Sequence, residues 1–572
     1  SNGDIYAATG LGFGQLGRIH RSEDDGITWT EITPPLNTQL RIELAVAPSQ
    51  SATTETTRIY AVAQDRSNFI DVAWFLRSDD GGATWSQLTI PQYREQNCFT
   101  SGRDFTRGQA FYDLILAVAP NDADVVTMGG INVLRSENGG ITTAEVSYWT
   151  GGCDSFVHAD IHEITFRPGF PNEALVGTDG GVYYSPNLGN FSDPSFQSRN
   201  QNYSVTQFYA VAAANEAGSD YFLAGSQDNG TQQFTTSGGL STRSATGGDG
   251  GYTHIDQTDA RFQVTSFTRN SINHSSNGGV SFRRFLDDQS SGLFINPTDL
   301  DNSSHVLYSA GNNNQLFRLR NINSSNPDAQ ESLSLSIGRV THIQANALAT
   351  DRVFVGNTVG EVYRIDNANS ANPQVTLISQ GINAFGSVSS VAIGASDDQL
   401  VATFSNFGVS SVWYTADGGS TWINKDESSH GLPDMPIRWA IFAPNDATQL
   451  LLATDLGIWS SDNITDSNPG WEPTNNNLSN VRCSMLKIRS ADDVLVVATY
   501  GRGLFTTNAF SDFEDSTPPA IVSLTPADDE IDVARSQTFE VTFNEVVVPG
   551  VGDIEIRRSA DDSLFEALDV SG

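Results

Sequence analysis

The stretch Ser-Asp-Asp-Gly-Gly-Ala-Thr-Trp at residues 78–85 is typical of a tight β-hairpin turn with a fixed chemistry. The side chain of Asp80 can accept hydrogen bonds from backbone N–H groups of the turn, as Asp side chains commonly do. Gly82 permits a positive φ, where a side chain would clash. Thr84 begins the next strand, and Trp85 supplies a large apolar face to bury against a neighbouring sheet.

The same pattern recurs along the chain with the same spacing. The residues equivalent to Asp80 are Asp24, Asn138, Asn277 and Asp417, and those equivalent to Trp85 are Trp29 and Trp422. A repeat of this kind identifies a fold and does not by itself name a function. We expect each turn to join the third and fourth strands of a repeat, its Asp to bond turn amides, and the three Trp side chains to be largely buried.

Between these turns the chain repeats four short strands in roughly every 45–55 residues, the spacing of propeller blades. We therefore predict an all-β fold, a tandem β-propeller followed by part of an Ig-like β-sandwich. The expected domains are an incomplete propeller of about four blades at 1–203, a second of about seven blades at 204–510, a linker at 511–519 and the start of an Ig-like domain at 520–572. The alternative to two rings is one ring of about ten blades.

Charge excludes two classes of partner. The chain has 572 residues, a formal net charge of −36 and a pI near 4.3. Nucleic acids and anionic membrane surfaces both need a basic face, so neither is an expected partner. No apolar run is long enough to span a membrane. The acidic, lysine-poor composition suits a secreted or cell-surface protein, and we expect flanking domains to extend it into a larger surface assembly.

The three cysteines do not make a disulfide framework, but two of them are predicted to pair. Cys98 and Cys153 both lie in polar loops that lead from an outermost strand to the next innermost strand, at adjacent junctions. Such loops emerge on the same face, and an extracellular setting permits the bond. Cys483 lies in an apolar strand, where a buried thiol behaves as a small hydrophobic group.

The repeated turn resembles the Asp-box, or BNR repeat, of sialidases, sortilin-like receptors and two-propeller glycoside hydrolases. Residues 1 to about 510 look like secreted repeat proteins of Bacteroidota and share the architecture of xyloglucan-cleaving two-propeller hydrolases. This resemblance implies propellers and export, with type IX secretion as the route. Residues 520–572 resemble a bacterial Ig-like domain of surface-layer and adhesin proteins. The stretches that carry the propeller resemblance are 157–162, 177–183, 205–209, 225–231 and 247–252.

Asp249 is the candidate catalytic residue that this resemblance implies. The stretch Gly-Asp-Gly-Gly-Tyr at 248–252 resembles the loop that holds the general acid in the two-propeller hydrolases. Asp179, in a similar Asp-Gly-Gly loop, is the candidate base of an inverting pair, which needs carboxyl groups about 6.5–9.5 Å apart. The alternative is that both are turn aspartates that accept hydrogen bonds from their own backbone. The family's base normally lies in the first blade, and we expect this chain to begin after that blade.

A second constellation, His158, Asp160 and His162, has the i, i+2, i+4 spacing that shares one face of a strand. Two imidazoles and a carboxylate suit a transition metal such as zinc, and a structural metal ion is the one cofactor that the sequence suggests. The alternative is a polar rim at the mouth of a propeller channel.

Other enzyme classes lack their residues in this sequence. A sialidase needs an arginine cluster, whereas the arginines here are dispersed, and neither a Gly-x-Ser-x-Gly elbow nor a P-loop is present. The sequence thus favours a non-catalytic propeller that binds a polysaccharide or a cell-surface protein, as a scaffold or adhesin. Tyr203, Phe208 and Tyr252 are the expected exposed stacking residues. The alternative is a glycoside hydrolase that uses Asp249.

Overall fold

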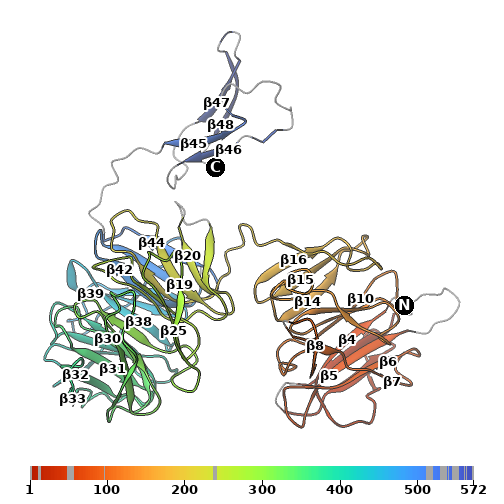
Figure 1. The fold of residues 1–572 in the computed structure, drawn as a ribbon, viewed down its shortest axis with the longest axis horizontal. Helices are drawn as coiled ribbons and strands as arrows, with labels where there is room; N and C mark the ends of the chain where they lie inside the picture. Colours follow the sequence, from red (N-terminus) through yellow and green to blue (C-terminus); the bar gives the residue numbers. More distant parts are fainter. Residues whose placement is uncertain are drawn as a thin grey trace. The chain divides into compact units, whose positions relative to one another are not determined.

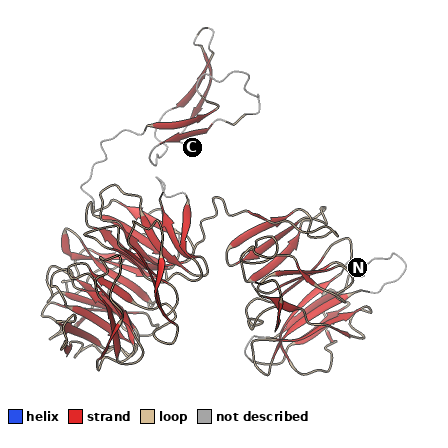
Figure 2. Cartoon of the chain, in the orientation of Figure 1, coloured by secondary structure: helices blue, strands red, loops and turns tan. Residues whose placement is uncertain are grey.

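The computed structural model is all-β, and none of the residues that it describes lies in a helix (Figure 2). By their contacts these residues divide into a first unit, Ser1–Tyr203, and a second unit, Ser204–Gly572. The described residues are 3–10, 14–47, 57–95, 97–235, 241–478, 480–510, 520–527, 537–538, 540–543, 553–558, 561 and 563–569. The expected linker at 511–519 lies outside them.

In the first unit, antiparallel strands pair in chain order into sheets that form propeller blades (Figure 1). The sheets are β1–β3, β4–β7, β10–β13 and β14–β17, and β8 and β9 form a hairpin between the second and third sheets. The first strands β1, β4, β10 and β14 contact one another in turn, so they are the innermost strands. The strands are β1 (Ile5–Thr9), β2 (Arg18–Ser22), β3 (Thr30–Glu31), β4 (Gln39–Val46), β5 (Ile59–Asp65), β6 (Val72–Ser78), β7 (Ser86–Leu88), β8 (Gln92–Arg94), β9 (Thr100–Asp104), β10 (Ile115–Val118), β11 (Val126–Gly129), β12 (Val133–Ser136), β13 (Ala144–Glu145), β14 (Ile161–Phe166), β15 (Ala174–Thr178), β16 (Gly181–Ser185) and β17 (Gln197–Ser198).

The second unit contains seven further sheets of the same kind, each an antiparallel meander. They are β18–β21, β22–β25, β26–β29, β30–β33, β34–β37, β38–β41 and β42–β44. The strands are β18 (Phe208–Ala213), β19 (Phe222–Ser226), β20 (Gly230–Phe234), β21 (Thr242–Thr246), β22 (Thr253–Ile255), β23 (Gln263–Ser266), β24 (Asn270–Ser275), β25 (Arg283–Asp288), β26 (Thr298–Asp301), β27 (Val306–Ala310), β28 (Gln315–Leu319), β29 (Glu331–Ser334), β30 (Val340–Ala345), β31 (Val353–Asn357), β32 (Val362–Asp366), β33 (Gln374–Leu377), β34 (Val388–Ile393), β35 (Leu400–Phe404), β36 (Val412–Thr415), β37 (Ile423–Asn424), β38 (Ile437–Ala443), β39 (Asp446–Thr454), β40 (Gly457–Ser461), β41 (Glu472–Pro473), β42 (Cys483–Arg489), β43 (Val494–Thr499) and β44 (Leu504–Thr507).

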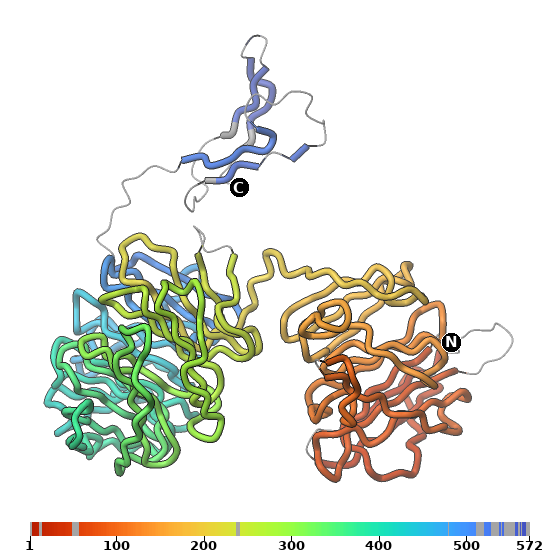
Figure 3. The backbone as a smooth tube through the Cα atoms, in the orientation of Figure 1, coloured from red at the N-terminus to blue at the C-terminus, as the bar shows by residue number. Residues whose placement is uncertain are grey.

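These seven sheets close into a ring among themselves. β18 packs against β42 and β43, and the two ends share one core in which Phe208 and Met485 are buried. Gln207 bridges Tyr500, and the N–H of Gly501 donates to the carbonyl of Thr206 at 3.2 Å. The backbone of β42–β44 accordingly lies beside that of β18–β20 (Figures 1 and 3). The closure is therefore made within the second unit and needs no blade of the first.

Beyond the ring, four strands form two hairpins. β45 (Ile521–Thr525) pairs with β46 (Glu540–Phe543), and β47 (Asp553–Arg557) pairs with β48 (Leu564–Asp569). Both pairs are antiparallel, as strands of an Ig-like sandwich are.

The five repeated turns have the hydrogen bonds that their residues predict, and each joins the last two strands of its sheet. In the turn between β6 and β7, Asp80 accepts the N–H of Thr84 at 2.8 Å, and Ser78 accepts the N–H of Gly82 at 2.8 Å. Gly82 has a φ of +95°. In another copy Asn138 accepts the corresponding N–H at 2.9 Å. The turn is thus closed by its own side chains.

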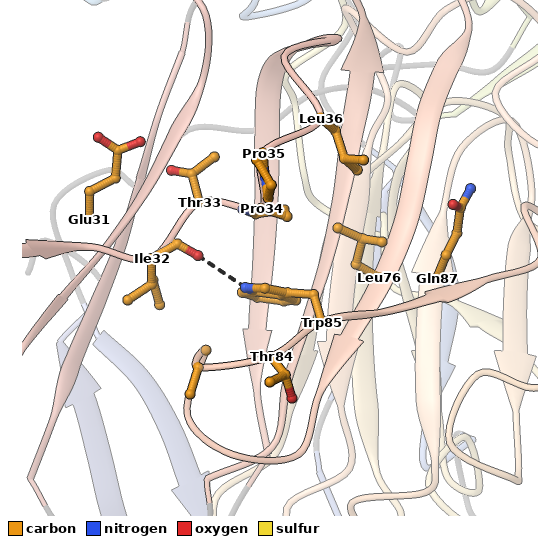
Figure 4. A pocket seen from close by; sticks show the side chains of 12 residues that line it. Glu31, Ile32, Thr33, Pro34, Pro35, Leu36, Leu76, Thr84, Trp85 and Gln87 are labelled. Carbon is orange, nitrogen blue, oxygen red and sulfur yellow. Dashed lines mark hydrogen bonds between the residues drawn. The ribbon is translucent and has the colours of Figure 1, made fainter.

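Trp85 joins its blade to the preceding one (Figure 4). Its Nε1 donates to the carbonyl of Ile32, which directly follows β3, at 3.0 Å. The indole is partly buried and lines a pocket together with Pro34 and Leu76. The repeated Trp therefore acts as a contact between neighbouring blades.

Trp422 and Trp29 show how this contact depends on a preceding blade. Trp422 is 9% exposed, and its Nε1 donates to the carbonyl of Ile378, just after β33 of the preceding blade, at 2.6 Å. Trp29 is 43% exposed and donates instead to Gly26 of its own turn, at 3.0 Å. The prediction that Trp29 is largely buried is wrong, because no described blade precedes its sheet to cover it.

A disulfide joins two loops of the first unit. Cys98, between β8 and β9, is bonded to Cys153, in the loop after β13, with a Cα–Cα separation of 5.6 Å. Cys483 lies on β42 as a free thiol, and it is fully buried.

Candidate functional site

The candidate site lies in the first unit, where segments next to β10 and β14 meet the turn between β15 and β16. His162, on β14, places its Nε2 at 2.8 Å from Oδ1 of Asp179, in that turn. The hydroxyl of Tyr112, which precedes β10, donates to Oδ2 of Asp179 at 2.9 Å. The register of β14 on β15, in which Ile161 pairs with Thr178, brings the first two residues together.

Exposed aromatic side chains flank this pair. Phe111 is 40% exposed and Tyr112 is 37% exposed. The Tyr112 ring meets the His162 ring edge to face, with centroids 4.7 Å apart. Arg41, on β4, donates to the carbonyls of Phe111 and Tyr112 at 3.3 and 2.8 Å. The guanidinium therefore holds the two aromatic residues through their backbone.

The metal-binding set predicted from His158, Asp160 and His162 does not form. The strand begins only at Ile161, and Asp160 has a φ of +64°, so the alternation of a strand does not extend over these residues. His158 contacts its neighbour's carbonyl through Nδ1, and the ligand atoms of the three residues do not gather within 4.8 Å of one another. The three side chains do not share a face because the backbone at Asp160 is not extended.

Asp160 instead lies among carboxyl groups. Gln109 donates to its Oδ1 at 3.2 Å. Burial raises the pKa of Asp160, and the charge of Asp179 raises it further. The interaction with His158 lowers this pKa and so opposes the rise. Burial, together with the charge of Asp160, raises the pKa of Asp113 to about 10. This part of the first unit therefore gathers carboxyl groups in a partly desolvated place, which favours their protonated form.

Asp249, the candidate acid, lies in the second unit at the start of the segment that leads to β22. Its Oδ1 accepts the backbone N–H of Asp228 at 3.1 Å. Its backbone bridges Gly230, whose N–H donates to the carbonyl of Gly248 at 2.5 Å. The carboxylate thus accepts a backbone N–H from the hairpin between β19 and β20, 21 residues away in the chain.

Of the three predicted stacking residues, only Tyr203 is well exposed, at 50%. Phe208 is 2% exposed and packs on Phe234 in the core where the ring closes, so its predicted exposure is wrong. Tyr252 is partly buried against the same core, with its ring 6.5 Å from that of Trp439. The exposure of both residues was overestimated because packing between blades covers the innermost strands and the segments that lead into them.

Phe111, Tyr112 and Asp113 are not among the site residues predicted from the sequence. A local signal for them exists, since the segment Phe-Tyr-Asp directly precedes the innermost strand β10. The segment 158–160 occupies the same place before β14, in the next blade. Polar and aromatic residues just before consecutive innermost strands therefore predict a shared site at that end of the strands.

Comparison with known proteins supports the C-terminal assignment. Residues 515–563 match the family described as "Bacterial Ig-like domain". No curated protein matches the chain. Among the described residues, no helix is long and apolar enough to cross a membrane.

Solved structures with a similar course of the chain include two GH74 proteins. The GH74 xyloglucanase of Xanthomonas campestris is 16% identical with a TM-score of 0.26, over 91% of this chain and 80% of that one. The GH74 enzyme of Niastella koreensis is 16% identical with a TM-score of 0.25, over 88% and 89%. The extracellular domain of a protein named as a one-component system of B. thetaiotaomicron is 13% identical with a TM-score of 0.40, over 97% and 79%. At these scores the similarities assign no function.

Proposed function

We propose that this protein is a non-catalytic, glycan-binding propeller protein that acts outside the cell or on its surface. The observation that carries the proposal is the pair of exposed aromatic residues, Phe111 and Tyr112, beside the carboxylate of Asp179 and the ring of His162. Aromatic faces bind the apolar faces of sugar rings, and a carboxylate accepts hydrogen bonds from their hydroxyl groups.

The setting outside the cell is supported by three features. Residues 515–563 match a bacterial Ig-like domain. The disulfide between Cys98 and Cys153 belongs to an oxidising compartment. The net charge of −36 keeps the protein from nucleic acids and anionic surfaces and leaves neutral polysaccharides as suitable ligands.

The hydrolase alternative has less support from the same residues. A general acid has to hold a proton and present it to the glycosidic oxygen. Asp249 accepts a backbone N–H, an interaction that favours the charged carboxylate. Asp179, the proposed base, accepts hydrogen bonds from Tyr112 and pairs with His162. Both carboxylates therefore have positions and partners that suit binding better than turnover.

The test is a glycan array probed with the full chain, followed by calorimetry on the strongest ligand. We expect Phe111→Ala and Tyr112→Ala each to weaken binding by about tenfold or more, which corresponds to roughly 1.4 kcal/mol. The matched control is Phe191→Ala, since Phe191 is also an exposed aromatic residue of the first unit, at 64%. That variant should bind as the unchanged protein does.

The same preparations test the alternative. Reducing-sugar release from β-glucans that disappears in Asp249→Asn, with folding unchanged, would show that the protein is a hydrolase. Absence of binding to every glycan, or equal losses in Phe191→Ala and Tyr112→Ala, would contradict the proposed binding surface.

A further inference from the structure

A pocket of about 540 Å³ lies between the first two blades of the first unit, next to their outer strands. It is lined by residues 31–36, by Leu76 and Gln87, and by residues 82–85 of the repeated turn (Figure 4). β3 and β7 are the last strands of their sheets, whereas Phe111 and Tyr112 precede an innermost strand, so the pocket is separate from the glycan surface proposed above. Its volume falls within the range of about 300–1,000 Å³ that is typical of small-molecule sites.

Trp85 gives this pocket a fixed apolar surface. Its Nε1 donates to the carbonyl of Ile32 at 3.0 Å, so the ring is held in place and its one polar atom is already used. Pro34, Pro35 and Leu36 line the pocket with it, and Leu36 is 42% exposed. A side chain that is held before binding loses little freedom when a ligand arrives, which favours affinity. The apolar surface of an indole suits the apolar face of a sugar ring.

The pocket also contains polar side chains that can bond hydroxyl groups. Glu31 and Gln87 lie to either side of the Trp85 indole in Figure 4, and both are exposed, so a ligand in the pocket can reach them. A carboxylate accepts hydrogen bonds, and a side-chain amide both donates and accepts them. An apolar surface between two such groups matches a ligand with an apolar face and hydroxyl groups along its edges.

The charge of the pocket narrows the class of ligand. Glu31 is the only charged residue among those that line it, all of which the structure describes, and Nε of Arg18 lies 3.2 Å from its carboxylate. Phosphate, sulfate and carboxylate ligands are recognised by Arg and Lys, and neither lines this pocket. A wholly apolar ligand would cover Glu31 and Gln87 without giving them hydrogen bonds, which is unfavourable. A neutral carbohydrate meets both conditions.

We propose that this pocket is a second carbohydrate site, which binds a short stretch of a neutral polysaccharide through the ring of Trp85 and the side chains of Glu31 and Gln87. The inference shares its ligand class with the proposed function. It stands on residues that the surface of Phe111 and Tyr112 does not use, so the two can fail separately.

The experiment uses the full chain carrying Phe111→Ala and Tyr112→Ala, which removes the first surface. Cello-oligosaccharides and manno-oligosaccharides are titrated into this double variant by calorimetry, and acidic oligogalacturonides serve as charged ligands that should not bind. We expect one-to-one binding of a neutral series to remain. Adding Gln87→Ala or Leu36→Ala should weaken it by about fivefold or more. The matched control is Gln197→Ala, since Gln197 is an exposed residue on the last strand of the fourth blade and does not line the pocket.

Trp85→Leu and Trp85→Phe test the ring itself. The Leu variant should bind more weakly than the Phe variant, which keeps an aromatic surface. Gln87 and Leu36 are exposed, so their variants are expected to fold even if those of Trp85 do not, and urea unfolding checks this.

The outcomes separate the two sites. Loss of all binding in the double variant would overturn the inference and leave the proposed function standing. Affinities that neither Gln87→Ala nor Leu36→Ala changes would overturn it as well. Undiminished binding in the double variant that is then weakened by Gln87→Ala would support the pocket and contradict the surface of Phe111 and Tyr112.

Discussion

Nε2 of His162 lies 2.8 Å from Oδ1 of Asp179, which joins the innermost strand of the fourth blade to the turn between its second and third strands. Tyr112 comes from the preceding blade, and its hydroxyl donates to the same carboxylate at 2.9 Å. A contact between consecutive blades thus fixes the direction of a partly exposed carboxylate. The proposed glycan surface depends on this arrangement as much as on the aromatic rings.

Tyr112→Phe separates the two contributions of Tyr112. The variant keeps the ring that meets His162 and removes the hydroxyl that donates to Asp179. We expect glycan affinity to fall less than in Tyr112→Ala, and the free energy of unfolding to fall by about 0.5–1.5 kcal/mol, the net worth of one hydrogen bond. Calorimetry and urea unfolding measure the two effects. Equal affinities for the Phe and Ala variants would show that the ring does not contribute.

Asp80→Ala tests the repeated turn as a structural device. The substitution removes the acceptor of the Thr84 N–H at 2.8 Å and of the Ser78 hydroxyl at 2.8 Å. We expect a loss of roughly 1–2 kcal/mol in the free energy of unfolding. Asp80→Asn is the matched control, because Asn138 accepts the same N–H in its own turn at 2.9 Å. Urea unfolding of the two variants should therefore differ, with the Asn variant closer to the unchanged protein.

These turns were predictable from the sequence because their partners are close in the chain. The acceptor and the donor are four residues apart, as Asp80 and Thr84 are, so local composition decides the contact. The strand rhythm was predictable for a similar reason, since each sheet is a meander of consecutive strands. Ring closure by β18 and β42 needed only the count of repeats in the second unit.

The site was less predictable because its contacts join residues far apart in the chain. Tyr112 and Asp179 are separated by 67 residues, and the contact between their side chains depends on how consecutive blades pack. The exposure of Trp29 and the burial of Phe208 likewise depend on which blade lies next to each residue. The spacing of His158, Asp160 and His162 misled because a single positive φ, at Asp160, breaks the alternation.

The disulfide should contribute to the stability of the first unit. Cys98 and Cys153 are 55 residues apart, and closing a loop of that size is expected to stabilise the folded state by about 2–4 kcal/mol. We expect the double variant Cys98→Ser, Cys153→Ser to unfold at a lower urea concentration, with a free energy of unfolding that is lower by this amount. Dithiothreitol should shift the unchanged protein in the same direction and leave the double variant where it is. A shift of both proteins by the reductant would assign the effect to something other than this bond.

The last prediction concerns two histidines of the second unit that are held neutral. His254 is 7% exposed, and its Nε2 lies 2.8 Å from the hydroxyl of Thr298. His342 is fully buried, has no hydrogen-bond partner for either ring nitrogen among the described residues, and meets the Trp439 ring edge to face. Burial, together with the charge of Lys487, lowers the pKa of both imidazoles to about 3.

A histidine whose pKa is lowered by folding destabilises the native state in acid. Its ordinary pKa is about 6.5, so between pH 6.5 and 3 the unfolded chain binds a proton that the folded chain does not. Above that range the histidines do not lower the free energy of unfolding. Within it, the free energy of unfolding falls by up to about 1.4 kcal/mol for each histidine and each unit by which the pH decreases. Burial raises the pKa of Asp299, so this carboxyl group contributes stability that increases as the pH falls, opposite to the two histidines.

We expect His342→Phe to reduce the loss of stability between pH 7 and 5, measured by urea unfolding. The same slope in His342→Phe and the unchanged protein would show that His342 takes up its proton without unfolding.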